Sequence, residues 1–336
     1  MRVLAVTNMY PTPNMPAFGT FIESEVESLR REGIEVDLLF INGRKNTINY
    51  LWGIPRLWAK LLTHRYDVIH AHYVFSGFIA RAQILYPVVL THHGVEVFRG
   101  WQSVPCQFIT PLVDRVIVRS QEMKRRLRCD EAEVIPAGID FTLFKPLPQQ
   151  ECRQLLELPS DKKLILWAGE YFRLEKRFDI VKEAVSILRQ RVSNAELVLV
   201  TGKPHSAMPL YMNACDVLLL VSDVEGSPNV VKEAMACNLP IVSVPVGDVP
   251  QIIEGCAGCY QCSQDPQDVA QKLEKALEWG KRTNGRERVQ YLDLAEISRR
   301  LVNVYEKALT SRSSRTVVWG KNLLNHRYKY PNRPPK

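Results

Sequence analysis

The chain has 336 residues, of which 46% are hydrophobic and 24% are charged. This length is enough for two domains that each bury a core, and the composition excludes a fibrous or disordered chain. The formal net charge is +8, and residues 310–336 supply most of it, because that stretch holds seven basic residues and no acidic one. No apolar run approaches the roughly 18 residues of a membrane-spanning helix. The first residues fit a strand better than a signal peptide, so we expect a cytoplasmic protein.

Apolar runs alternate with helical patterns from the first residue onward, which is typical of a parallel sheet covered by helices. A helix is clearest over residues 21–32, because Gly33 follows its last periodic residue. The strands predicted in the first half are Val3–Thr7, Val36–Phe40, Val68–Ala71, Pro87–Thr91, Arg115–Val118 and Glu133–Pro136. The pattern then starts again with Leu164–Ala168, Leu197–Thr201, Val217–Val221 and Ile241–Val244.

These two series predict an α/β protein with two units. We place an N-terminal Rossmann-like domain at residues 1–150, a C-terminal Rossmann-like domain at residues 151–309 and a basic tail at residues 310–336. The last long helical pattern, Leu292–Leu309, follows the second unit.

One segment, residues 217–240, carries the clearest chemistry. A buried strand ends in a short loop, after which Ser227 is a candidate N-cap and Pro228 suits the first helical position. The free N–H groups of Asn229 and Val230 would then point outward at the carboxyl edge of the sheet, where α/β proteins bind ligands. Two carboxylates, Glu225 in the loop and Glu233 in the helix, accompany them. Acids accept hydrogen bonds from hydroxyls and helix amides bind anionic oxygen, so the segment suits a hydroxylated ligand that carries phosphate.

This segment resembles the E-x7-E signature of GT-B glycosyltransferases of family 4, and the resemblance extends over nearly the whole chain except the basic tail. It implies two Rossmann-like domains facing each other across a cleft, with the C-terminal helix packing back toward the first domain. It also implies that Glu233 holds the donor ribose, that Glu225 approaches the sugar hydroxyls, and that amides near Gly226 and Ser227 hold the sugar.

The run that begins at Leu166 resembles the family's strand, turn and helix that supply an Arg and a Lys to the donor diphosphate. Lys176 matches the family Lys directly. The usual Arg position holds Glu170, so Arg173, three residues before the Lys, takes that role. Fixed cations at the leaving group remove the usual need for a metal, so we expect no metal and no cofactor.

In the first domain, the loop of residues 10–21 resembles the family's glycine-bearing loop, in which Gly19 lets the backbone approach the donor phosphate. His93 stands in the family's His-Gly position and would contact the donor sugar. A different pattern is also present, because His70, His72, His92 and His93 form two close pairs that would suit a zinc hydrolase.

The chain is short between Thr201 and Cys215, where typical family members carry an extra helix and strand that help to enclose the base. The donor nucleotide therefore stays open, and His205 is a candidate to replace the lost contacts. Cys256, Cys259 and Cys262 lack the fourth thiolate of a closed metal site, so a metal there is disfavoured.

Two segments offer contact with an anionic membrane surface. One is the basic tail, and the other is an amphipathic stretch around Trp52 and Trp58, which would equally suit a helix packed on the sheet. A membrane contact would place the protein peripherally at the inner face of the membrane.

We predict a retaining hexosyltransferase that moves a sugar from a nucleotide-sugar donor to a glycan or lipid-linked acceptor, in cell-surface or extracellular polysaccharide biosynthesis. Nucleic acid is not an expected partner. The alternatives are a nucleotide-sugar epimerase of the same architecture, the zinc hydrolase, and a non-catalytic binder that uses the basic tail.

Overall fold

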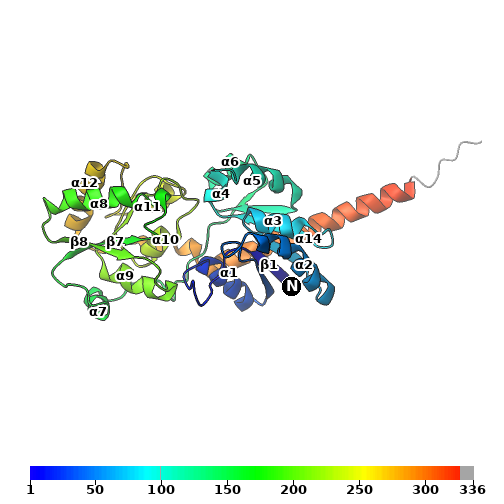
Figure 1. Cartoon of the computed structure of the whole chain (residues 1–336), viewed down its shortest axis with the longest axis horizontal. Coiled ribbons are helices and arrows are strands. Elements are labelled where there is room, and N and C mark those ends of the chain that lie inside the picture. The colour runs from blue at the N-terminus through cyan, green and yellow to red at the C-terminus, as the bar shows by residue number, and fades with distance from the viewer. Residues whose placement is uncertain (99, 326–336) are drawn as a thin grey trace, which may run out of the picture.

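The computed structural model describes residues 1–98 and 100–325, without the side chains of Val95 and of residues 312–325. Two α/β domains lie beside each other, each with a parallel sheet between helices (Figure 1). The first sheet has the order β2 (Glu35–Phe40), β1 (Arg2–Thr7), β3 (Val68–His72), β4 (Val88–His92), β5 (Arg115–Val118) and β6 (Glu133–Val134). The second has the order β11 (Tyr260–Gln261), β10 (Ile241–Ser243), β9 (Val217–Leu220), β7 (Lys163–Ala168) and β8 (Ala195–Val200).

All strand pairs in both sheets are parallel, as the alternating pattern predicts. Each predicted strand is present within one or two residues of its expected bounds, and the additional strand, β11, was not predicted. Central strands such as β3 and β4 are buried at every position, because helices cover both faces of the sheet.

The helices of the first domain are α1 (Thr20–Arg31), α2 (Ile48–Thr63), α3 (Val74–Arg81), α4 (Val95–Phe98), α5 (Ser103–Ile109) and α6 (Gln121–Leu127). Those that follow are α7 (Gln149–Leu155), α8 (Phe178–Arg189), α9 (Met208–Ala214), α10 (Asn229–Ala236), α11 (Val249–Ile253), α12 (Pro266–Trp279), α13 (Gly285–Arg288) and α14 (Leu294–Asn325). Four apolar clusters, two for each sheet, form the cores.

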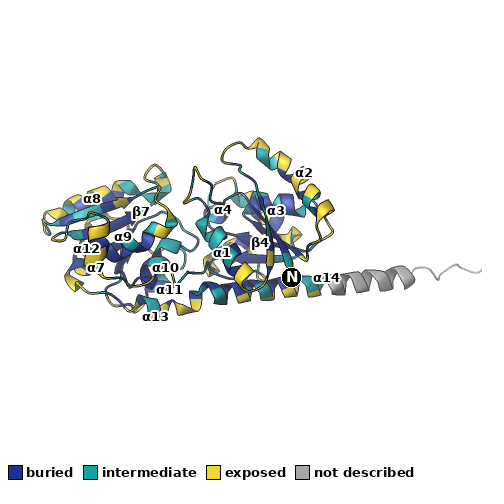
Figure 2. Ribbon diagram, turned by 90° about the horizontal axis from the view of Figure 1, so that it is seen from below, coloured by how far each residue is buried: buried dark blue, intermediate teal, exposed yellow. Residues whose placement is uncertain are grey.

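Helix α14 returns from the second domain and runs along the first (Figure 2). Its apolar face joins the core beneath the first sheet, with Leu301, Val304 and Tyr305 fully buried there. Ser298 also donates a hydrogen bond of 2.7 Å to Ser28 of α1. The expected packing of the last helix against the first domain is therefore confirmed.

The backbone of α14 stays helical to Asn325, so no break separates residue 309 from the start of the predicted tail. The basic side chains of that tail lie outside the described residues, and its proposed contact with anionic partners stays a prediction. Among the described residues, no helix combines the length and the apolar character needed to cross a bilayer.

Candidate active site

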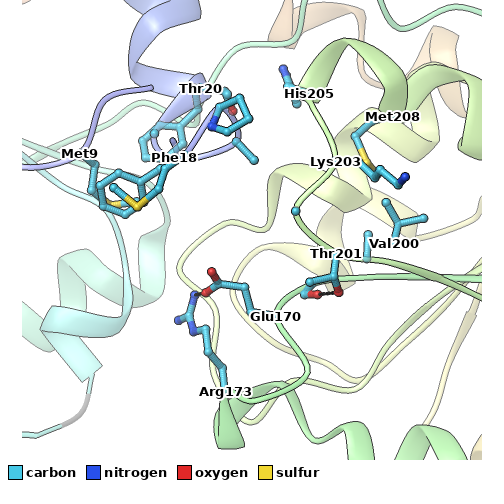
Figure 3. Close-up of a pocket in the computed structure, with 18 of the residues that line it drawn as sticks. Met9, Phe18, Thr20, Glu170, Arg173, Val200, Thr201, Lys203, His205 and Met208 are labelled. Carbon is cyan, nitrogen blue, oxygen red and sulfur yellow. Dashed lines mark hydrogen bonds and ion pairs between the residues drawn. The ribbon is translucent and has the colours of Figure 1, made fainter. Parts of the chain in front are cut away.

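A cavity of about 490 Å³ lies between the two domains. From the first domain, the loop before α1 lines it with Phe18 and Gly19, and from the second domain the ends of β7 and β8 line it with Arg173 and His205. Figure 3 shows these groups facing one another across the opening. The cavity stands at the carboxyl ends of both sheets, where parallel α/β folds bind ligands.

Gly19 directly precedes α1 and has a φ of 78°. A Cβ there would lie 2.6 Å from the backbone carbon of Met9, so the loop can fold back on itself only with glycine. The close turn brings the backbone of residues 17–20 to the cavity wall, as the predicted role of Gly19 requires.

The turn after β7 supplies cations to the cavity floor. Lys176 ends a short 3-10 helix (Leu174–Lys176), and its Nζ lies 2.6 Å from Oε1 of Glu225. Both side chains are largely buried, with 19% and 15% of their surface exposed. Arg173 is paired with Glu175 and lies 4.0 Å from Glu170. Glu225 therefore holds the side chain of Lys176, and Glu175 holds that of Arg173.

The start of α10 differs from the expectation in one respect. The helix begins at Asn229 with Pro228 in the N-cap position, so Ser227 does not cap it and Pro228 is not the first helical residue. The Ser227 hydroxyl instead donates a 2.5 Å hydrogen bond to the carboxylate of Asp248. A buried acid from the next loop thus competes successfully for the hydroxyl that local sequence assigns to the cap.

Glu233 sits in the second turn of α10, and its Oε1 lies 2.8 Å from Nε2 of His205. His205 comes from the short connection after β8, so the chain places a histidine where the sequence predicted missing contacts. Burial opposes the charged imidazole, but the Glu233 carboxylate outweighs it, and the pKa of His205 is raised. His205 therefore lines the cavity beside the acid predicted to hold the ribose.

His93 follows β4 and lies in the loop that faces the second domain. Its ring stacks on Tyr73, with centroids 4.4 Å apart, and packs against Phe21, which lines the cavity. Burial, Arg119 and the neighbouring histidines hold its pKa well below the usual value, so the imidazole is neutral. The Glu96 carboxylate accepts from the backbone N–H groups of both His93 and Gly94, which fixes the loop.

Two glycines, Gly94 of the first domain and Gly226 of the second, lie against each other at the domain contact. A Cβ on Gly226 would lie 2.5 Å from the His93 carbonyl oxygen and 2.7 Å from Cα of Gly94. The sugar-binding loop predicted in the second domain thus touches the His-Gly loop of the first, backbone against backbone. This contact places His93, Gly226 and Glu225 around one point of the cleft.

The four histidines of the zinc hypothesis do not form one set. His92 points away from the others and bonds Thr110 through Nε2 at 3.1 Å. His70 and His72 lie near Glu25, but Arg119 already holds that carboxylate at 2.9 Å. A buried guanidinium beside the group would repel a bound cation.

The three clustered cysteines also separate. Cys256 and Cys262 belong to cores on opposite faces of the second sheet. Cys259 lies beside Cys256, and their interaction lowers the pKa of Cys256 to about 7. The arrangement gives a thiol pair and not a three-thiolate ligand set.

Sequence reasoning missed several buried polar residues. Arg119 precedes the basic run Lys124–Arg128, which is typical of an exposed helix, but only 2% of Arg119 is exposed and it pairs with Glu25. Lys232, adjacent to Glu233, is fully buried without a hydrogen-bond partner among the described residues. In the sequence, the position of Lys232 within the E-x7-E segment could have marked it as a functional residue.

Comparison with known proteins agrees with this arrangement. The model of Glycosyltransferase Family 4 matches residues 12–143, and the model of Glycosyl transferases group 1 matches residues 198–278. The putative teichuronic acid biosynthesis glycosyltransferase TuaC of Bacillus subtilis is 27% identical over 326 aligned residues, covering 75% of this chain and 83% of that relative. D-inositol 3-phosphate glycosyltransferase of Thermobispora bispora is 24% identical, covering 82% of this chain and 78% of that relative.

Solved structures share the architecture. Sucrose-phosphate synthase from Thermosynechococcus elongatus has a TM-score of 0.75 at 20% identity and covers 93% of this chain and 100% of that one. HepE from Anabaena, in complex with UDP, has a TM-score of 0.65 at 17% identity and covers 91% of this chain and 100% of that one. The fold and the two family models define a glycosyltransferase of the GT-B class. Within that class, the chain belongs to glycosyltransferase family 4.

Proposed function

We propose that this enzyme transfers a sugar, with retention of configuration, from a nucleotide-sugar donor to a glycan or lipid-linked acceptor in polysaccharide biosynthesis. The observation that carries the proposal is the pairing of both E-x7-E acids with basic side chains at one interdomain cavity, Glu225 with Lys176 and Glu233 with His205. The solved HepE structures in complex with UDP and with UDP-glucose support a nucleotide-sugar donor. The similarity to TuaC, a putative teichuronic acid biosynthesis glycosyltransferase, supports an acceptor in a polysaccharide pathway.

In this proposal the second domain holds the donor. Glu233 accepts hydrogen bonds from the ribose, and Lys176 and Arg173 bind the diphosphate. Glu225 contacts the sugar hydroxyls, together with backbone amides at the start of α10, those of Gly226, Ser227, Asn229 and Val230. Charge-assisted hydrogen bonds of this kind contribute about 1.5–3 kcal/mol each.

The transfer itself needs stabilisation of the departing phosphate. As the glycosidic bond breaks, negative charge grows on the leaving diphosphate, and the fixed Lys176 ammonium lies where it can offset that charge. The acceptor hydroxyl attacks from the leaving-group face, and its proton passes to the departing phosphate. No protein nucleophile and no metal take part in this scheme.

We further propose that the first domain rests on an anionic membrane. Helix α2 buries Leu57 and Leu61 against the core, so the predicted alternative of a helix packed on the sheet is correct for this face. Its other face is also strongly apolar, with Trp52 61% exposed. Helix α3 lies beside it and α5 lies beside α3. This region exposes further apolar side chains, namely Ile48, Leu51, Leu62, Ile84, Leu85, Trp101, Val104 and Phe108. Such a cluster exceeds the scattered exposure of ordinary surfaces.

A panel of nucleotide sugars tested by thermal shift identifies the donor, because a bound donor raises the melting temperature by mass action. The matching donor is then incubated with and without acceptor, and the anomeric configuration of the product is read by NMR. An epimerase would convert the donor without acceptor. A Glu233→Ala variant with full transfer and normal donor binding would refute the site.

Membrane contact is tested separately by co-sedimentation with vesicles of anionic and of neutral lipid. We expect binding to the anionic vesicles that falls in a Leu51→Ser/Trp52→Ser double variant. Equal binding of the wild type and the double variant would refute the role of this surface while leaving the transferase assignment intact.

A further inference from the structure

A continuous group of buried polar side chains lies behind His93. Its Nε2 is 3.2 Å from Nδ1 of His72, and Nε2 of His72 is 3.7 Å from Oε1 of Glu25. The other carboxylate oxygen of Glu25 accepts a 2.9 Å hydrogen bond from Arg119, which also donates to the Ile135 carbonyl. Except for His93, these side chains are almost fully buried. Their protonation states therefore depend on the neighbouring side chains and not on bulk water.

Glu25 Oε1 is buried and has no hydrogen-bond partner among the described residues. The nearest ring nitrogens are Nε2 of His72 at 3.7 Å and Nδ1 of His70 at 3.9 Å. His70 is already committed, because Tyr305 of α14 bonds its Nδ1 at 2.8 Å and Thr91 bonds its Nε2 at 2.7 Å. The carboxylate charge therefore favours a proton on Nε2 of His72.

A neutral imidazole carries one ring proton. Burial and Arg119 lower the pKa of His72 to about 3, so at neutral pH this ring is uncharged. With its proton on Nε2, Nδ1 of His72 is an acceptor, and the 3.2 Å contact requires Nε2 of His93 to be the donor. His93 then has no proton on Nδ1.

We propose that His72 is a positioning residue that holds His93 in a single tautomer, with the proton on Nε2 and a lone pair on Nδ1. Glu25 and Arg119 in turn determine which ring nitrogen of His72 carries its proton. The inference rests on the proposed function and on the contact between His93 and the donor sugar that the family resemblance implies. Its free nitrogen accepts a hydrogen bond, so the sugar presents a hydroxyl there and not a carboxylate. The residues come from α1, β3, the end of β4 and the end of β5, so the device depends on the folded first domain.

The experiment is selective ¹⁵N labelling of histidine in the full chain, with long-range ¹H–¹⁵N spectra that distinguish protonated from unprotonated ring nitrogens. A His93→Ala variant assigns the His93 signals. We expect the wild type to show His93 protonated at Nε2. A wild-type His93 protonated at Nδ1, or present as a mixture of tautomers, would overturn the inference without any variant of His72.

His72→Leu then removes the acceptor. We expect a mixed His93 tautomer and a kcat lowered by about tenfold or more, the scale seen when a group that orients a functional histidine is lost, with a smaller change in the donor KM. His72→Asn keeps an acceptor oxygen near the Nδ1 position and is expected to restore most of the rate.

Thr110→Val is the matched control, because it removes an equally buried hydroxyl-imidazole bond, to His92, outside this group. It is expected to leave the His93 tautomer and kcat unchanged. An unaltered His93 spectrum in His72→Leu would overturn the inference. If the tautomer changes but His93→Ala transfers sugar normally, the positioning by His72 stands and the role of His93 in the proposed function fails.

Discussion

The contact between the two domains at Gly226 makes a quantitative prediction about catalysis. A Cβ added at this position would stand 2.5 Å from the His93 carbonyl oxygen, and ordinary contacts begin near 3.4 Å. The loops that carry His93 and Glu225 must therefore separate by roughly 0.9 Å in a Gly226→Ala variant. The two nearest atoms belong to the backbone of His93 and Gly94, so the movement of a side chain alone cannot relieve the clash.

A displacement of about 1 Å between groups that must align costs on the order of 100-fold in rate. We expect kcat of Gly226→Ala to fall by about that factor, equivalent to roughly 2.7 kcal/mol in the activation barrier. The assay is steady-state transfer with saturating donor and acceptor. The two closest clashes are with the backbone of the His-Gly loop and not with a core side chain, so the cooperative unfolding transition should persist.

Gly33→Ala provides the matched control. This glycine has a φ of 80° and no atom within 4 Å of an added Cβ, so the variant tests backbone strain without any clash. We expect it to lose about 1 kcal/mol of stability and no activity. A Gly226→Ala enzyme with kcat within twofold of the wild type would show that the two loops are not in contact during turnover.

Three further predictions concern charge. Lys176→Met should lower kcat by about 10²- to 10³-fold in the same transfer assay, because one fixed donor to a developing anion is worth that much; an unchanged kcat would remove Lys176 from the leaving-group site. The raised pKa of His205 means that its pair with Glu233 stabilises the donor-free protein fully below about pH 6.5 and loses this effect as pH rises through the raised value. The melting temperature of the wild type should therefore fall across that window relative to His205→Asn, and parallel pH profiles would contradict the pairing. Transfer should also survive excess chelator, measured with and without added Mg²⁺ or Zn²⁺, and loss of activity that Zn²⁺ restores would favour the hydrolase-type site.

The fold was largely predictable because buried parallel strands leave a strong apolar signal over four to six residues. β11 has only two residues, Tyr260 and Gln261, and no Val, Ile or Leu lies beside them, whereas the equally short β6 contains Val134 and is followed by Ile135. The predicted strand that reached Pro136 ends at Val134 in the sheet, because proline has no N–H to donate to a neighbouring strand.

The sequence predicted those parts of the site that lie within one segment. It did not predict interactions between side chains that are far apart in the sequence. Glu225 and Glu233 lie on one loop and the helix after it, and their spacing together with the resemblance to the E-x7-E signature predicted a common site. Arg119 is buried by Glu25, which lies 94 residues earlier. Ser227 loses its predicted cap to Asp248, 21 residues later. No local pattern contains these tertiary pairs.

The site pairs each of its two acids with a basic side chain that the proposed donor would also meet. Lys176 neutralises Glu225 and His205 offsets Glu233, so neither acid stands alone in a partly buried cleft. Donor binding under the proposed mode exchanges partners: the diphosphate takes Lys176, and the ribose hydroxyls donate to Glu233. Glu225 and Glu233 then accept from sugar hydroxyls, and the incoming diphosphate adds negative charge that favours a protonated His205. Because a ligand that raises a group's pKa binds more tightly when that group is protonated, donor affinity should increase as pH falls toward the ordinary imidazole range. His205→Asn should abolish this increase, and isothermal titration of the donor at two pH values measures it directly.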